Sequence, residues 1–300
     1  MQLVPLGKTG LQITRLGVGL AEIGNLDLSE APQAGTVLNT ALDAGINFLD
    51  TAACYGNSEE LIGLTVPHRR SEYILATKCG HMAGDYNGEP WTSQTIIHSI
   101  ERSLRYMKTD YLDLIQLHSC DLEVLKQGEV IQTLQDAKDA GKTRFIGYSG
   151  DNEHAEWAVN SGVFDTLQTS FSLVDQRARH GLLQAAEAKG MGIIIKRPIG
   201  NGVWGAARSN RPYTDEYFNR AQLMQKEGEL PELSQNDIYL AMAFVFSHNE
   251  VSTAIVGTSN PVHMRSNIDL VEGNLHLPEE TRAELYRRFD KLGGNWTQQI

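Results

Sequence analysis

The sequence predicts an α/β fold, a (β/α)8 (TIM) barrel with a β-hairpin before it and a C-terminal helix and tail after it. Short β-branched, apolar runs alternate with helical stretches along almost the whole chain. The length of 300 residues is normal for a single barrel. No internal repeat, low-complexity segment or linker divides the sequence, so we expect one domain over residues 1–300.

The expected strands follow a clear order. The stretch LVPLGKTGLQITRLGVG predicts a β-hairpin that turns at Lys8, Thr9 and Gly10. The candidate strands of the barrel begin near Leu16, Asn47, Tyr73, Tyr111, Arg144, Asp165, Gly192 and Thr253.

Helical stretches lie between these strands. The clearest begins at Thr92 or Ser93 and places apolar side chains from Ile96 to Met107 on one face. Two further helices are expected to stop at Gly141 and Gly190, since glycine commonly ends a helix.

The alternative fold is an open, doubly wound sheet. That fold usually carries a glycine-rich phosphate turn after its first strand, and here only GVGLAEIG follows, which is weak support. Long connections are expected to border the site: residues 79–91, residues 200–233 and the tail GGNWTQQI after Leu292.

Composition excludes several classes of function. A net charge of −11 argues against nucleic-acid binding, because a phosphate backbone needs a basic face. The wholly apolar runs are far too short to cross a membrane, and MQLVPLGKTG does not resemble a signal peptide. Three cysteines indicate no disulfide framework, so we expect a cytoplasmic protein.

Four residues predict the site. Asp50, Lys78 and His118 each close an apolar run, and Tyr55 follows the first run by a few residues. The ends of parallel barrel strands share one face, so these side chains should converge there. A lysine beside a tyrosine should lower the pKa of the phenol, and Asp50 should keep Lys78 charged. Such a site can protonate a carbonyl oxygen that receives hydride, and the hydride must come from a cofactor.

Each of these residues alone would more often be structural. An aspartate at a strand end commonly caps a helix, a histidine in a strand is commonly a satisfied core residue, and a lysine is usually solvated. The set of four at successive strand ends favours the catalytic interpretation.

Several segments together resemble the aldo-keto reductase family. They cover almost the whole chain in the family's order: LGKTGLQITRLGVG, NFLDTAACYGNSEELIG, ATK, SIERSLRYMKTDYLDLIQLH and GKTRFIGYS. The resemblance implies Tyr55 as the general acid, Lys78 and Asp50 as its tuning pair, and His118 as the group that orients the carbonyl. It also implies reversible reduction of an aldehyde or ketone with NADPH, or alternatively NADH, bound across the barrel mouth.

The resemblance further assigns residues to the cofactor. Ser149 and Gln168 would hold the nicotinamide amide, KRPIGNGVWG resembles the pyrophosphate loop, and VGTSNPVHMRSN resembles the adenosine end. The assigned residues are Gly19, Leu20, Asp50, Ser149, Gln168, Lys196, Arg197, Pro198, Ile199, Gly200, Gly202, Gly257, Thr258, Ser259, His263 and Asn267.

The chain departs from the family's pattern at a few positions. Lys196 stands where many relatives have an aromatic residue that stacks on the nicotinamide, and Gly150 stands where the family often has Asn. His263 stands where relatives that clamp a 2′-phosphate often have Arg. Arg265 could serve instead, so we expect NADPH to be preferred over NADH by a modest margin.

The three long connections each contain a tryptophan. Trp91, Trp204 and Trp296 could form an apolar wall for a small carbonyl substrate, or they could simply fasten the loops that carry them.

Two other functions stay open at this level. Some members of the family act as regulatory subunits that use the bound nicotinamide as a redox sensor. A metal-dependent barrel enzyme would need a cluster of ligands at strand ends, and only Asp50 and His118 qualify. Cys54, Cys79 and Cys120 contain no C-x2-C pair, so we expect no metal site.

Overall fold

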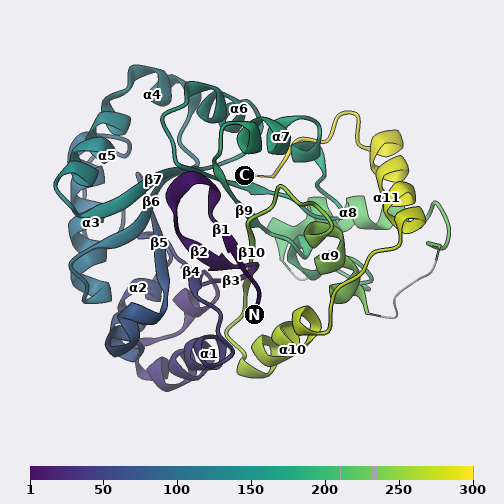
Figure 1. Ribbon diagram of the computed structural model, residues 1–300, viewed down its shortest axis with the longest axis horizontal. Helices are drawn as coiled ribbons and strands as arrows, with labels where there is room; N and C mark the ends of the chain where they lie inside the picture. The colour runs from purple at the N-terminus through teal and green to yellow at the C-terminus, as the bar shows by residue number, and fades with distance from the viewer. Residues whose placement is uncertain (210, 232–235, 300) are drawn as a thin grey trace.

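A computed structural model describes residues 1–209, 211–231 and 236–299. A closed barrel of eight strands lies at the centre of the molecule, in the order β10-β3-β4-β5-β6-β7-β8-β9, with helices around it (Figure 1). The barrel strands are β3 Leu16–Gly19, β4 Phe48–Asp50, β5 Ile74–Cys79, β6 Leu112–His118, β7 Thr143–Ser149, β8 Thr166–Ser170, β9 Gly192–Lys196 and β10 Thr253–Gly257.

The predicted barrel is confirmed, and every predicted strand begins within one residue of its observed start. All neighbouring barrel strands are parallel. The last strand, β10, pairs on one side with β9 and on the other with β3, where Val256 lies opposite Val18. This pairing closes the sheet and excludes the open, doubly wound alternative.

The predicted hairpin is also present, as β1 Leu3–Pro5 and β2 Gln12–Thr14 joined through a short 3-10 turn. Its buried side chains Leu6, Leu11 and Ile13 pack with the barrel-interior residues Phe48 and Ile194. The hairpin therefore plugs the amino-terminal end of the barrel, and the opposite end, where the strands finish, is left for the site.

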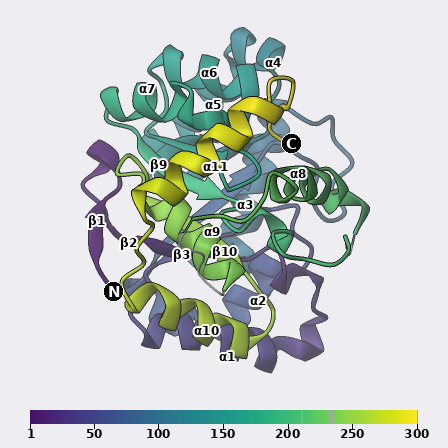
Figure 2. The same cartoon turned by 90° about the vertical axis from the view of Figure 1, so that its right-hand side faces the viewer.

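Most of the helices cover the outside of the barrel. They are α1 Ala31–Asp43, α2 Ser58–Thr65, α3 Ser93–Met107, α4 Leu122–Gln127, α5 Glu129–Asp139, α6 Asn152–Ser161, α7 Leu182–Ala188, α8 Asp215–Gln225, α9 Asp237–Phe246, α10 Pro261–Glu272 and α11 Glu279–Leu292. Thr92 caps α3 by accepting a hydrogen bond from the backbone N–H of Thr95. The C-terminal helix α11 lies outside the barrel on the same side as α8 and α9 (Figure 2).

The long connections differ in content. Residues 80–92 contain no helix or strand, whereas the described part of residues 200–233 contains two 3-10 turns and α8. Residues 210, 232 and 233 of the second connection, and Ile300 of the tail, lie outside the described residues. No described helix has the length and hydropathy that a bilayer crossing requires.

Helix α2 packs so closely on the end of α3 that Gly63 cannot carry a side chain. A Cβ there would lie 1.8 Å from the backbone oxygen of Tyr106. We expect Gly63→Ala to lower the free energy of unfolding by about 1–3 kcal/mol, because the backbones must move apart. Gly35→Ala in α1 is the control, since its Cβ would meet only the Thr65 side chain at 3.3 Å. Denaturant titration of both variants measures the difference, and equal stabilities would contradict the close approach.

Candidate active site

Lys78 and Asp50 form a buried ion pair inside the barrel. Nζ of Lys78, in β5, lies 2.5 Å from Oδ1 of Asp50, the last residue of β4, and both side chains are almost fully buried. The same ammonium donates to the backbone oxygen of Thr51 at 2.8 Å. The second carboxylate oxygen of Asp50 accepts from Gln168 at 2.8 Å and from Gln116 at 3.2 Å.

This pair keeps a buried lysine charged. Burial alone would lower the pKa of Lys78, but Asp50 and Tyr55 together outweigh that effect, and the pKa is raised above its usual value. The cation is therefore present at neutral pH, in the place where the sequence predicted it.

Tyr55 lies above this pair, in the loop between β4 and α2. Nζ of Lys78 is 5.1 Å from the centre of the tyrosine ring, and the phenol oxygen is 3.4 Å from Nε2 of His118. Burial raises the pKa of Tyr55, and the lowering effect of Lys78 offsets only part of that rise. The expected net lowering of this pKa was therefore wrong, because it counted the cation and left out desolvation.

His118 ends β6 and faces the same cavity as Tyr55. Its Nδ1 lies 3.4 Å from the thiol of Cys54, and its ring makes an edge contact with His81 at 5.1 Å between centroids. Burial and the nearby cation of Lys78 hold the pKa of His118 well below its usual value. The imidazole is therefore neutral at physiological pH, and it carries one N–H donor.

A buried network fixes the loop that carries Tyr55. Arg102, from α3, donates to the backbone oxygen of Ala53 at 3.1 Å and to Glu59 at 2.9 Å. Glu59 also accepts from the hydroxyls of Thr77 and Ser103, at 2.7 and 2.6 Å. The hydroxyls of Thr51 and Ser58 lie 2.7 Å apart and close the base of the loop. This network holds the phenol in one position relative to the strand ends.

A cavity of about 820 Å³ opens over these side chains. The predicted site residues that line it are Gly19, Leu20, Asp50, Tyr55, His118, Gln168, Lys196, Arg197, Pro198, Ile199, Gly202, Gly257, Thr258, Ser259 and His263. Lys78 lies beneath the cavity against Asp50, and Ser149 is buried with its hydroxyl 2.9 Å from Gln168. Gly200 and Asn267 do not line the cavity.

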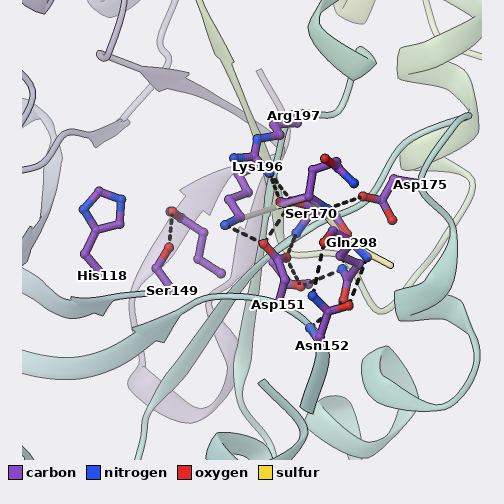
Figure 3. Close-up of polar contacts among 12 residues, drawn as sticks. His118, Ser149, Asp151, Asn152, Ser170, Asp175, Lys196, Arg197 and Gln298 are labelled. Atoms are coloured by element: carbon purple, nitrogen blue, oxygen red, sulfur yellow. Dashed lines mark hydrogen bonds and ion pairs between the residues drawn. The ribbon is translucent and has the colours of Figure 1, made fainter. Parts of the chain in front are cut away.

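Lys196 does not point freely into the cavity. Its ammonium lies 2.8 Å from Oδ2 of Asp151, which is fully buried and also accepts from the backbone N–H of Ser170 at 2.7 Å (Figure 3). Burial alone would raise the pKa of Asp151, but Lys196 and these hydrogen bonds outweigh it and lower the pKa. A paired lysine thus stands at the position where the family resemblance implied an aromatic residue.

Gly150, the other departure, is explained by its neighbour. A Cβ at Gly150 would lie 2.5 Å from the hydroxyl of Tyr148, which donates to the backbone oxygen of Cys120 at 2.8 Å. An asparagine side chain has no room there.

His263 and Arg265, the two residues predicted to bind a 2′-phosphate, lie on different faces of the first turn of α10. His263 lines the cavity, but Arg265 is exposed and does not. Two residues along a helix turn the side chain by about 200°, so the two cannot share a face. The structure therefore does not support Arg265 as a substitute for the missing arginine.

None of the three tryptophans lines the cavity. Trp91 packs against His81 at 5.0 Å and so lies one ring behind the cavity wall. Trp204 is buried in the core, and Trp296 packs on Phe289 and Arg220. These contacts favour the structural interpretation, in which the tryptophans fasten their loops.

Sequence reasoning did not assign several residues to the site. Gln116 lies two residues before the end of β6 and Asp151 two residues after the end of β7, and their closeness to strand ends could have identified them. His81 and the pair Glu22–Arg211, 3.4 Å apart, also line the cavity. Nothing in the sequence links Glu22 to Arg211, because they come from connections far apart in the chain.

Comparison with known proteins agrees with this arrangement. The family model described as "Aldo/keto reductase family" matches residues 15–286. The chain belongs to the aldo/keto reductase family. It is therefore an oxidoreductase of a family that uses nicotinamide cofactors.

Relatives match over nearly their full length. L-galactose dehydrogenase of Arabidopsis thaliana is 28% identical, with 95% of this chain and 93% of that protein covered. NADH-specific methylglyoxal reductase of Escherichia coli is 26% identical, with 94% and 97% covered. The holo form of aldo-keto reductase AKR11C1 from Bacillus halodurans is similar in fold, with a TM-score of 0.81, 24% identity and 96% of each chain covered.

The residues present fit a dinucleotide. Gly19 and Gly257 lie opposite each other where β3 and β10 end, and a Cβ at Gly257 would lie only 3.0 Å from the oxygen of Gly19. Exposed backbone of this kind lets a phosphate approach closely. The cavity continues to the amino end of α10, which favours an anion through its unpaired N–H groups.

The field of Lys78 on Tyr55 can be tested without a substrate. We expect Lys78→Met to raise the pKa of Tyr55 further, because the cation that favours phenolate is lost. Ultraviolet difference titration, with Tyr55→Phe subtracted in each background, should show Tyr55 ionising at higher pH in Lys78→Met than in wild type. Lys196→Met is the matched control, since that buried lysine pairs with Asp151. An equal shift in both variants, or none in Lys78→Met, would contradict the tuning role.

Proposed function

We propose that this protein reduces an aldehyde or ketone to an alcohol with NADPH, and that it catalyses the reverse oxidation. The observation that carries the proposal is the meeting of Tyr55 and His118 at 3.4 Å, facing one cavity above the buried Lys78–Asp50 pair. A hydroxyl and a neutral imidazole side by side can bind one carbonyl oxygen between them.

The bound nicotinamide supplies the hydride. The phenol of Tyr55 gives its proton to the carbonyl oxygen as negative charge develops there. A protonated phenol is the resting form, because burial keeps the pKa of Tyr55 high. An alkoxide oxygen is far more basic than a phenolate, so proton transfer to the developing alkoxide runs downhill even from a tyrosine with a raised pKa.

Lys78 stabilises the phenolate that the transfer leaves behind, and Asp50 holds the ammonium in place. His118 fixes the carbonyl oxygen beside the phenol and stays neutral, so it does not compete as an acid. Ser149 donates a hydrogen bond to Gln168, which in turn donates to Asp50, and these two side chains would hold the nicotinamide amide next to this group.

We expect Tyr55→Phe to lower the rate of carbonyl reduction by about 10²–10⁴-fold, because general acid catalysis typically accelerates a reaction by that factor. Cofactor binding should persist, since the phenol lies at the substrate end of the cavity. Steady-state turnover and cofactor fluorescence titration measure the two separately.

Turnover near that of wild type in the Phe variant would contradict the role of Tyr55. Tight cofactor binding by wild type without turnover of any aldehyde or ketone would favour the redox-sensing alternative instead.

The preference for NADPH rests on the polar end of the cavity. At the head of α10 this end of the cavity is lined by Thr258, Ser259, Asn260 and His263. No lysine or arginine of α10 lines the cavity. Hydroxyls, backbone N–H groups and an imidazole grip a phosphate more weakly than a guanidinium does. We therefore propose that NADPH is preferred over NADH, but only modestly.

His263→Arg should tighten NADPH binding by about tenfold and leave NADH binding nearly unchanged, because only NADPH carries the 2′-phosphate. Arg265→Ala is the control and should leave both dissociation constants close to those of wild type, since Arg265 faces away from the cavity. Equal gains for both cofactors in His263→Arg would show that this loop does not read the 2′-phosphate.

A further inference from the structure

Arg197 is the first residue after β9, and its side chain lines the cavity. Its backbone is in the left-handed region, with φ at 56°. Nη1 donates to the hydroxyl of Ser170 at 3.1 Å (Figure 3) and to the backbone oxygen of Gln299. The guanidinium lies 5.2 Å from the centre of the Tyr213 ring. Its partners in these contacts are uncharged groups.

The two lysines near Arg197 at this end of the barrel already have ion-pair partners. Lys78 pairs with Asp50 at 2.5 Å and Lys196 with Asp151 at 2.8 Å. Among the described residues, which exclude Ile300, Arg197 has no carboxylate within ion-pair distance. Asp151 acts on it electrostatically but pairs with Lys196, so the positive charge of Arg197 has no ion-pair partner there, although its side chain is partly buried.

Asp175 is the other carboxylate of this region, and it faces different groups. Its Oδ2 accepts from the hydroxyl of Tyr217 at 2.6 Å and from the backbone N–H of Gln299 at 3.4 Å. Burial raises the pKa of Asp175 to about 7. It is only partly ionised at neutral pH and does not contact Arg197, so it does not supply the missing charge.

The charge of Arg197 reaches the reacting groups. It is one of the cations that lower the pKa of Tyr55 against the larger effect of burial, and it also contributes to the low pKa of His118. Tyr55, His118 and Arg197 line the same cavity, so one small molecule could contact the guanidinium and place a carbonyl between Tyr55 and His118.

We propose that Arg197 recognises an oxyanion, a carboxylate or a phosphate, on the carbonyl substrate itself. This inference rests on the proposed reductase function and names its substrate class. A guanidinium has five N–H donors, and the two hydrogen bonds above both come from Nη1, so donors remain for an oxyanion. An anion in the cavity would also compensate a buried charge that is costly to leave alone.

The direction of the side chain favours the substrate over a phosphate at the adenosine end of the cofactor. The guanidinium leans from β9 toward Ser170 at the end of β8. Gly257 and Gly19, where the backbone is open to phosphate, lie at the ends of β10 and β3, on the other side of β9. The arginine therefore points away from the phosphate end of the cavity.

The C-terminal tail holds the guanidinium in place. Gln298 is buried, and its amide donates to the backbone oxygen of Ser170 at 2.7 Å and to Thr169 at 3.1 Å. Its backbone N–H and side-chain oxygen also bond to Asn152, at 2.9 and 3.0 Å. These bonds fix Gln299, whose oxygen accepts from Arg197, so the cation is positioned before a ligand arrives.

Matched substrates test the proposal. Butanal and 4-oxobutanoate differ by one carboxylate, and glyceraldehyde and glyceraldehyde 3-phosphate differ by one phosphate. The measured quantity is the ratio of kcat/KM for the anionic substrate to that for the neutral one, and each pair reports its own oxyanion. We expect wild type to favour the anionic member of at least one pair, and Arg197→Gln to lower that ratio by roughly 10–100-fold.

Two variants control for charge and geometry. Arg197→Lys keeps the charge but loses the planar fork, so its ratio should fall between wild type and Arg197→Gln. Lys126→Gln removes one exposed positive charge on α4 and should leave the ratio at the wild-type value. Circular dichroism and thermal unfolding establish that the Arg197 variants fold.

Binding measurements distinguish a failure of the proposed reductase function from a failure of the proposed anion site. Cofactor dissociation constants, together with the affinities of butanoate and butanamide for the cofactor-loaded protein, require no turnover. Wild type should bind butanoate at least tenfold more tightly than butanamide, and Arg197→Gln should bind the two equally. If no aldehyde is reduced but this difference holds, the proposed function fails while the anion site stands.

The proposal is overturned if wild type shows no preference for either anionic substrate. It is also overturned if Arg197→Gln leaves the ratio unchanged. A weaker cofactor affinity in Arg197→Gln, with equal loss for both members of a pair, would assign Arg197 to the dinucleotide instead.

Discussion

The ion pair between Lys78 and Asp50 is the constraint on which the rest of the site depends. A lysine inside a barrel would lose its charge without a partner, and a single aspartate 2.5 Å away prevents this. Because Asp50 also accepts from Gln116 and Gln168, the same carboxylate ties together the ends of four strands, β4, β5, β6 and β8. The pair therefore sets both the electrostatics of Tyr55 and the geometry of the cavity floor.

The positive charge of Lys78 compensates only part of the effect that burial has on the pKa of Tyr55. Desolvation raises the pKa of Tyr55 more than the cation lowers it, so the resting phenol is firmly protonated. The same desolvation, with Lys78 beside it, keeps His118 neutral. The site thus has one proton to give, from one residue, with a neutral hydrogen-bonding group next to it. This division of roles follows from burial as much as from residue identity.

The sequence predicted the strands within one residue because their apolar runs and glycine-ended helices are local signals. It also predicted the four converging polar residues, because parallel strands end on one face. It did not predict what depends on distance across the fold: the burial that decides the pKa of Tyr55, the pairing of Lys196 with Asp151, or the packing of Trp296 on Phe289. Arg265 failed for a local reason, since helix periodicity turns it away from His263 and the cavity.

Lys196, which stands where the family resemblance implied an aromatic residue, affects more than one contact. A buried lysine requires a carboxylate, and Asp151 supplies it from the segment after β7. Asp151 in turn binds Ser170, whose hydroxyl holds Arg197 and whose backbone oxygen holds Gln298 of the tail. One substitution at the cavity wall is thus coupled to a polar network that reaches the C-terminus. Because Lys196 forms an ion pair with Asp151 within that network and Arg197 has no ion-pair partner among the described residues, Arg197 rather than Lys196 offers its charge to a ligand beside the network.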